Sequence, residues 1–435
     1  MTLRNLIYQS IIWRGLYFLS VLVLNIMIAR YYEASDSGII YFIVNSYALV
    51  VIAGSLSLES GTSYYLASEK SRPAELGFFS LFWTFAATIT ITVLLGLLIK
   101  LEVLPVLYKQ YYIPAVLYTG GCILSNFFLS LFYAKKSFLI PNLLMIIVNL
   151  LLIALIPFAD NIFSRRQYID FYFGGFLLQG ILIALAFFMV FGTGKKMILP
   201  GRATITGIFK YAFQALGANL LFFLLYRIDY WFVERYCTAS DLGNYIQVSK
   251  LVQIFLVIPM MVASAVFPVS AQGNTSVIRQ KVLQLSRILT VLCLIGCIIF
   301  ASSGYWLFPL VYGKSFSNMY IPFLLLVPGI LSLSIINVLS AYFAGQNMVW
   351  VNLIGALLGL VFIIILDIIF IPVYGIAAAA LISSFGYIIN MLFSIRYFRH
   401  GQDISITGFF HFTYSDWLKL KNEVEGKLLI QKNKA

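Results

Sequence analysis

The stretch that decides the fold runs from Lys314 to Arg396 and reads KSFSNMYIPFLLLVPGILSLSIINVLSAYFAGQNMVWVNLIGALLGLVFIIILDIIFIPVYGIAAAALISSFGYIINMLFSIR. Between its two ends it contains one charged residue, Asp367. An α-helix needs roughly 20 apolar residues to cross the ~30 Å hydrocarbon core of a bilayer, so this stretch alone is long enough for about three crossings. It predicts a protein that spans a membrane several times.

Uncharged apolar runs of spanning length recur along the rest of the chain. They cover residues 76–99, 111–134, 137–159, 171–194 and 288–313. Long continuous runs favour helices over a β-barrel, whose strands give only an alternating pattern of ~10 residues. We therefore predict an all-α polytopic membrane protein with twelve transmembrane helices. The expected spans are 6–30, 38–65, 76–99, 110–134, 138–159, 170–193, 208–234, 242–269, 287–309, 320–343, 350–371 and 374–396.

Composition excludes several classes of function. Charged residues make up 10% of the chain, against roughly 25% in soluble domains. The four cysteines show no disulfide-like spacing, and both histidines lie in the C-terminal tail, so we predict no metal site and no cofactor. The net charge of +13 is better explained by orientation in a membrane than by a nucleic-acid partner.

The basic residues are distributed unevenly between the two sides of the predicted spans. Of the 29 lysines and arginines, 19 fall on the N-terminus, the even-numbered connections and the tail, 7 on the odd-numbered connections, and 3 inside spans, which sums to 29. Cytoplasmic loops carry the excess of Lys and Arg in membrane proteins. Both termini are therefore expected in the cytoplasm.

The chain contains signs of an internal duplication. The pattern R-Y-x-x-A-S-D-x-G occurs at residues 30–38 and again at 235–243, an offset of 205. A second pair, Ala134 with Asn142-Leu143 and Ala344 with Asn352-Leu353, has an offset of 210. The two halves would be related by an axis along the membrane normal, with a substrate site at their interface.

This repeat gives a domain organisation. We expect an N-terminal six-helix lobe at 1–194, a cytoplasmic inter-lobe linker at 195–207, a C-terminal six-helix lobe at 208–398 and a polar tail at 399–435. In the tail, apolar residues from Trp417 to Leu428 recur at helical spacing among lysines. A short amphipathic helix on the membrane surface and a solvated tail both explain this pattern.

Several motifs, in this order and spacing, resemble polysaccharide flippases of the multidrug/oligosaccharidyl-lipid/polysaccharide (MOP) exporter superfamily. They are Ile28-Ala29-Arg30 with Asp36-Ser37-Gly38, Arg227-Ile228-Asp229 with Leu242-Gly243-Asn244-Tyr245 and Lys250-Leu251, and Ile371-Pro372-Val373-Tyr374-Gly375. The resemblance covers about residues 5–398. It implies an O-antigen or capsule-type flippase that moves undecaprenyl-pyrophosphate-linked oligosaccharides across the bacterial inner membrane by alternating access, with a proton or sodium ion as coupling partner.

Six charged residues fall within predicted spans, where an ionisable group costs about 2.5–3.5 kcal/mol at mid-bilayer and usually faces a cavity or a partner. They are Arg14, Glu59, Arg227, Asp229, Lys250 and Asp367. An anionic lipid-linked substrate needs cationic groups, and guanidinium matches phosphate oxygens with paired donors. We therefore predict head-group binding by Arg227, Arg14 and Lys250, and ion coupling by Glu59 and Asp229.

Counting from the outer turns suggests which of these charges meet. Asp229 and Lys250 lie at matching depth, and Arg14 and Glu59 at similar depth, so each pair could form an ion pair that only fixes packing. Asp367 lies near the outer end of its span, where snorkelling to the interface is the simplest interpretation. Tyr226, Tyr230 and Trp231 beside Arg227 could stack on sugars or simply pack in the core.

Two other functions remain open. A cation-coupled multidrug exporter of the same superfamily would favour an acidic cavity, whereas here three basic residues balance three acidic ones. A membrane-embedded O-antigen polymerase or ligase would typically carry a large outward loop, and the longest outward connection here is short. Since the sequence also shows no nucleophile–base constellation, we predict a transporter and not an enzyme.

Overall fold

The computed structural model describes residues 3–158, 162, 164–191, 199–272, 275–400 and 406–410, and within these it is helical with no strand. The long helices are α1 (Leu3–Ser55), α3 (Pro73–Lys100), α5 (Tyr112–Ala134), α6 (Leu139–Leu155), α7 (Arg165–Phe191), α8 (Arg202–Arg227), α10 (Ala239–Phe255), α11 (Val257–Gln272), α12 (Thr275–Tyr312), α13 (Tyr320–Gly345) and α14 (Val349–Arg399). Short elements complete the described chain: α2 (Leu58–Ala67), α4 (Val106–Gln110), η1 (Ile156–Phe158), α9 (Asp229–Tyr236), η2 (Lys314–Met319) and η3 (Ile406–Phe409).

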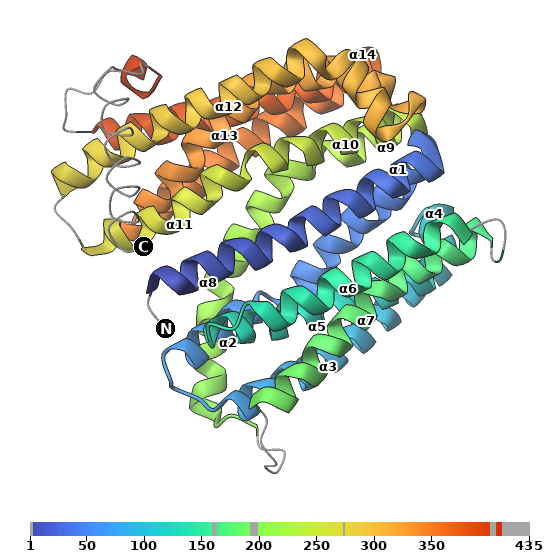
Figure 1. The fold of residues 1–435 in the computed structure, drawn as a ribbon, viewed down its shortest axis with the longest axis vertical. Coiled ribbons are helices and arrows are strands. Elements are labelled where there is room, and N and C mark those ends of the chain that lie inside the picture. Colours follow the sequence, from blue (N-terminus) through green and yellow to red (C-terminus); the bar gives the residue numbers. More distant parts are fainter. Residues whose placement is uncertain are drawn as a thin grey trace, which may run out of the picture. The chain divides into compact units, whose positions relative to one another are not determined.

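Two of these helices are hairpins that each cross a membrane twice. α1 turns at Glu33, where φ is 57°, and α14 turns at Gly375, where φ is 58°. Ten helical segments of the described chain are long and apolar enough to span a bilayer, and the two hairpins raise the number of crossings to twelve. The predicted fold class and span number are confirmed (Figure 1). Each predicted span falls on one long helix, on one arm of a hairpin, or on two successive helices, as at 208–234 and 242–269.

Three spans are interrupted within the membrane. α1 gives way to α2 at Leu56 and Ser57, both with positive φ, while α8 is separated from α9 at Ile228 and α10 from α11 at Leu256. Irregular backbone at membrane depth is tolerated only where protein groups or a wet cavity satisfy it. At the first break Asn219 Nδ2 donates to Ser57 Oγ over 3.0 Å. A polar side chain thus stabilises the backbone at the first of these breaks.

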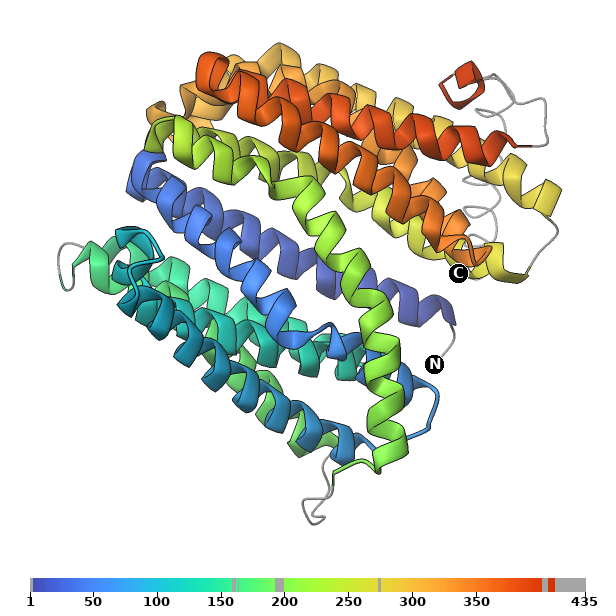
Figure 2. The same cartoon turned by 180° about the vertical axis from the view of Figure 1, so that it is seen from behind.

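By packing, the chain divides into two compact units. Unit 1 comprises residues 1–223 with 311–315, and unit 2 comprises 224–310 with 316–435. Within each unit, neighbouring helices lie side by side in both views (Figures 1 and 2). Residues 195–198 of the predicted linker, and most of the predicted tail, lie outside the described residues, and the lobe boundaries stay predictions.

In unit 1, glycines let α5 and α7 approach to backbone contact. A Cβ added at Gly121 would lie 2.4 Å from the backbone nitrogen of Leu177, and one at Gly180 would lie 2.8 Å from the carbonyl oxygen of Gly121. A buried polar chain ties three helices: Gln179 Nε2 donates to Asn149 Oδ1 and Asn149 Nδ2 donates to Ser20 Oγ, each over 2.9 Å. Both devices are typical of helix association in lipid.

In unit 2, the central helix is α14, which packs against α13 and α9. Its two arms cross at glycines: a Cβ on Gly359 would lie 2.6 Å from the carbonyl oxygen of Gly386, and one on Gly386 would lie 2.5 Å from the side chain of Ile363. Only glycine allows this approach. The crossing brings polar residues of the two arms, Asp367 and Ser383, to the same part of the unit.

Candidate functional site

Two acidic side chains are buried inside unit 2. Asp229, the first residue of α9, is 2% exposed, and Asp367, on the first arm of α14, is 0% exposed. They are close enough for their charges to interact. A second carboxylate in the same apolar surrounding makes it harder to keep both groups ionised.

Hydrogen bonds satisfy only one of the four carboxylate oxygens. Tyr245 of α10 donates its hydroxyl to Asp229 Oδ2 over 2.5 Å, and Ser383 on the returning arm of α14 donates to the same oxygen over 2.8 Å. Within the described chain, Asp229 Oδ1 and both oxygens of Asp367 are buried without a hydrogen-bond partner. Three oxygens are thus available to a proton or a small cation.

This arrangement can bind a cation because a buried carboxylate whose charge has no partner is unfavourable. A buried charge without a partner costs several kcal/mol, and carboxylate and hydroxyl oxygens are the ligands that hard cations prefer. The residues come from α9, α10 and both arms of α14, so the ion would bridge elements that are separate in sequence. No group of three His, Cys, Asp or Glu residues is gathered in the described segments.

The position of Asp367 corrects a prediction. Snorkelling to the membrane interface requires an exposed carboxylate, whereas this one is fully enclosed by protein. Asp367 lies eight residues before the Gly375 turn, or about 12 Å along the helix. Asp229 lies eight residues before Cys237, which ends α9, and is therefore at a similar depth. Comparing these two depths could have identified the pair from sequence.

Arg227 precedes the break between α8 and α9 at Ile228, whereas Asp229 follows it; Lys250 lies on α10. Arg227 is the last residue of α8 and is half-buried, and the charge of Arg227 acts on Lys250 of α10, which is also half-buried. The predicted ion pair between Lys250 and Asp229 is not formed, because Tyr245 and Ser383 are the partners of Asp229. Arg227 thus places a guanidinium near Lys250, and a guanidinium suits an anionic group.

In unit 1, Arg14 and Glu59 are not paired in this conformation. The guanidinium of Arg14 lies 5.5 Å from the centre of the Tyr133 ring. Glu59 begins α2 just after the Leu56–Ser57 break, with Oε2 buried and without a partner in the described chain. Among described residues, the one salt bridge within a unit is Arg166 with Asp170, at 3.8 Å. The coupling role of Glu59 stays a prediction.

The three aromatic residues predicted to stack on sugars differ in their surroundings. Tyr230 is buried and packs edge-on against Tyr245, with ring centres 5.9 Å apart, so in this conformation it belongs to the core. Tyr226 is half-buried and lies 5.8 Å from Tyr387, centre to centre. Trp231 is also half-buried. For Tyr230 the core-packing alternative is therefore the better description.

Comparisons with known proteins agree with this architecture. A model of the family described as "Polysaccharide biosynthesis protein" matches residues 173–321, which contain Arg227, Asp229, Tyr245 and Lys250. No curated protein matches the sequence. The match covers the first half of the candidate site but not Asp367 or Ser383.

Solved structures with the same fold are transporters. "Lipid II flippase MurJ, inward closed conformation" has a TM-score of 0.72 at 17% identity, over 92% of this chain and 89% of that chain. A multidrug resistance MATE family transporter of the MOP superfamily, in an inward-facing conformation, has a TM-score of 0.70 at 14% identity, over 88% and 94%. "MATE transporter ClbM in complex with Rb+" has a TM-score of 0.59 at 15% identity, over 94% and 96%.

These matches confirm the resemblance seen in the sequence. The chain is a multi-pass membrane protein, and its described helices reproduce an architecture whose neighbours are transporters and flippases rather than enzymes. Residues 173–321 thus match the family described as "Polysaccharide biosynthesis protein", and the described helices have the fold of MOP-superfamily transporters.

Proposed function

We propose that the chain is a flippase that moves an anionic lipid-linked oligosaccharide, of the undecaprenyl-pyrophosphate class, outward across the bacterial inner membrane by alternating access. Both termini would face the cytoplasm. The polysaccharide family match and the fold shared with a lipid II flippase support the substrate class. The observation that carries a coupled mechanism is the buried pair Asp229–Asp367, with three carboxylate oxygens lacking a partner in the described chain.

In this mechanism the carboxyl pair binds a monovalent cation, either a proton or a sodium ion. A MATE transporter of the same fold is described in complex with Rb+, which supports a site for a monovalent cation here. Asp229 begins α9 and Arg227 ends α8, so any movement of α9 that accompanies ion binding also displaces the guanidinium two residues away. A ligand shifts an equilibrium between conformations only by its differential affinity for them. Ion binding at Asp229 and head-group binding near Arg227 would be linked through that short segment.

Multidrug export is the second candidate, because MATE transporters share the fold. The buried acidic pair could in principle attract an organic cation. However, Ser383 and Tyr245 both donate hydrogen bonds to Asp229, and the guanidinium of Arg227 suits an anionic ligand. Charge therefore favours the lipid-linked glycan.

A reconstituted transport assay tests the proposal. Proteoliposomes carrying a fluorescent polyprenyl-pyrophosphate oligosaccharide would receive a proton or sodium gradient, and the exposed label would be measured by a membrane-impermeant quencher. We expect gradient-driven flipping that Asp229→Asn and Asp367→Asn abolish. Asp170→Asn, in an exposed ion pair, serves as the matched control. Wild-type rates in both buried variants would exclude the pair as the coupling site, and export of organic cations without lipid flipping would favour the multidrug function.

A further inference from the structure

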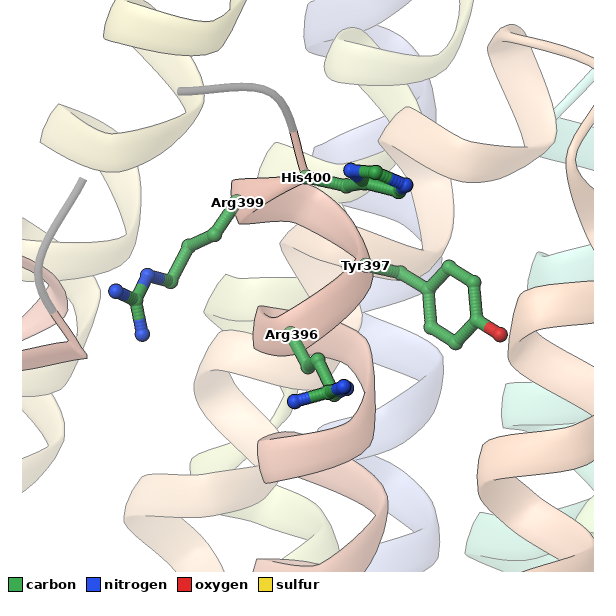
Figure 3. Close-up of a pocket in the computed structure, with 4 residues that line it drawn as sticks. All are labelled: Arg396, Tyr397, Arg399 and His400. Atoms are coloured by element: carbon green, nitrogen blue, oxygen red, sulfur yellow. The ribbon is translucent and has the colours of Figure 1, made fainter. Parts of the chain in front are cut away.

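A pocket of about 440 Å³ lies at the end of α14, far along the chain from the carboxyl pair. Its lining includes Arg396, Tyr397, Arg399 and His400. Figure 3 shows Arg399 on one side of the last helical turn, Tyr397 and His400 on the other, and Arg396 between them. The charge distribution of the sequence predicts that this end of unit 2 faces the cytoplasm.

None of the described residues that line the pocket is acidic, and two of them are arginines. No acidic residue occurs between Asp367 and the end of α14. Arg396 and Arg399 are three residues apart and Arg396 and His400 four apart, spacings at which helical side chains are neighbours and like charges destabilise one another. Arg399 Nε is also buried without a hydrogen-bond partner in the described chain. Among the described residues, the arginines of this pocket therefore have no carboxylate beside them.

An apolar surface leads directly to the arginines. Leu381, Phe385 and Leu392 are exposed, and with Arg396 they follow one another at helical spacings of four, seven and four residues, so they form one stripe along the returning arm of α14. At its end the exposed ring of Trp350, from the first arm, lies 5.0 Å from the ring of Tyr397 at 88°. Trp and Tyr are the residues that proteins place at the level of lipid head groups.

We propose that this end of α14 binds one anionic phospholipid of the surrounding bilayer. Its phosphate lies among Arg396, Arg399 and His400, and one acyl chain lies along the stripe of Leu381, Phe385 and Leu392. Guanidinium donates paired hydrogen bonds to phosphate oxygens, and basic pockets at the cytoplasmic ends of membrane helices are suited to anionic head groups. A lipid whose head group carries an extra amine would add a positive charge to an already cationic pocket, so an anionic lipid is preferred.

This lipid is distinct from the transported one. The stripe is an outer surface of unit 2, whereas the proposed coupling and head-group residues Asp229, Arg227 and Lys250 are buried or half-buried within the unit. The inference therefore stands independently of the transport function. It assigns to the arginines a role beyond setting membrane orientation.

Native mass spectrometry of the full-length protein tests this site. The protein in mild detergent is incubated with equimolar phosphatidylglycerol and phosphatidylethanolamine of identical acyl chains, and the retained lipid is identified. We expect selective retention of one phosphatidylglycerol, reduced at least about tenfold by Arg396→Gln with Arg399→Gln. Lysine at both positions keeps the charge and should retain more lipid than glutamine. Lys135→Gln with Lys136→Gln, in the α5–α6 turn of unit 1, removes the same charge elsewhere and should change nothing.

Three results would overturn the proposal. Equal retention of both lipids by the wild type would show that the pocket does not select an anionic head group. Unchanged selectivity in the double glutamine variant would place the lipid elsewhere. Complete displacement of phosphatidylglycerol by millimolar inorganic pyrophosphate would show a site for a soluble anion. Should the double variant fail to elute as a monodisperse protein, Arg396→Gln alone gives the same test, because that side chain is exposed.

Discussion

Ser383 donates a hydrogen bond of 2.8 Å to Asp229 Oδ2 and thereby joins the returning arm of α14 to the first residue of α9. Tyr245 donates to the same oxygen, whereas Oδ1 is buried without a hydrogen-bond partner in the described chain. These two donors stabilise the ion-free carboxylate. In the proposed mechanism they would help the site to release its cation, which a transport cycle requires as much as binding.

From this relationship we predict that Ser383→Ala tightens cation binding. Removing a donor to a charged acceptor destabilises the ion-free state by about 1.5–3 kcal/mol, so the half-saturating cation concentration should fall about tenfold or more, and turnover should slow because release becomes harder. The measurement is the dependence of flipping on proton or sodium concentration. Ser384→Ala is the matched control, since Ser384 Oγ donates to the carbonyl oxygen of Leu325 and not to Asp229. An unchanged half-saturation in Ser383→Ala would contradict the assignment.

Arg227 should be needed for substrate and not for folding. Arg227→Ala is expected to abolish surface glycan while leaving the protein in the membrane, because it removes the guanidinium proposed to bind the anionic head group. Lysine should rescue only partly, since an ammonium cannot give the paired donors of guanidinium. Surface glycan and membrane-inserted protein would be quantified in the same cells.

Arg235→Ala provides the control for this experiment. Arg235 lies on the same span, and its guanidinium packs over the ring of Tyr236 at 5.7 Å on an exposed part of α9. Its replacement should leave glycan export unchanged. Normal export by Arg227→Ala would remove it from the substrate site.

The twelve spans were predictable because their signal is local. Continuous apolar runs determine where a helix can cross lipid, and polar turn residues such as those around Glu33 mark where the chain returns. The Gly375 turn was equally visible, since only a few residues separate the two predicted spans on either side of it. Element boundaries consequently differ from the prediction by a few residues in most cases.

The carboxyl pair was predictable only in part because it is a tertiary feature. Asp229 could be selected as a rare charge in a span, but its partners come from residues 245, 367 and 383, and nothing local connects those positions. The contact depends on the glycine crossing of α14 at Gly359 and Gly386, which brings the two arms together. The same limit explains why depth alone suggested an ion pair between Asp229 and Lys250 that the structure does not form.

Close packing in unit 1 yields a stability prediction. Gly121→Ala should lower the unfolding temperature, because its Cβ would lie 2.4 Å from backbone atoms of α7, which cannot move aside as a flexible side chain would. Overpacking of this kind costs roughly 1–3 kcal/mol. Gly174→Ala, on α7 with nothing within 4 Å of the new Cβ, should not lower it. Thermal unfolding of both variants in detergent, followed by intrinsic fluorescence, compares them, and equal unfolding temperatures would contradict the packing argument.

The last prediction concerns Glu59, whose Oε2 is buried without a partner in the described chain while Arg14 is engaged with Tyr133. We expect Arg14 and Glu59 to pair in the other conformation of the transport cycle, and Glu59 to hold a proton or cation while they are apart, as here. A buried carboxylate that alternates between two partners follows the same energetic rule as the Asp229–Asp367 pair: its charge must be neutralised in each state.

Glu59→Gln should then impair transport without loss of folded protein, and the swap Arg14→Glu with Glu59→Arg should restore folding but not transport. Glu69→Gln, an exposed carboxylate just after α2, is the control and should transport normally. Flipping would be measured across a range of pH values and ion gradients. If Glu59→Gln transports at the wild-type rate under all of these conditions, its carboxylate is structural, and coupling rests on Asp229 and Asp367 alone.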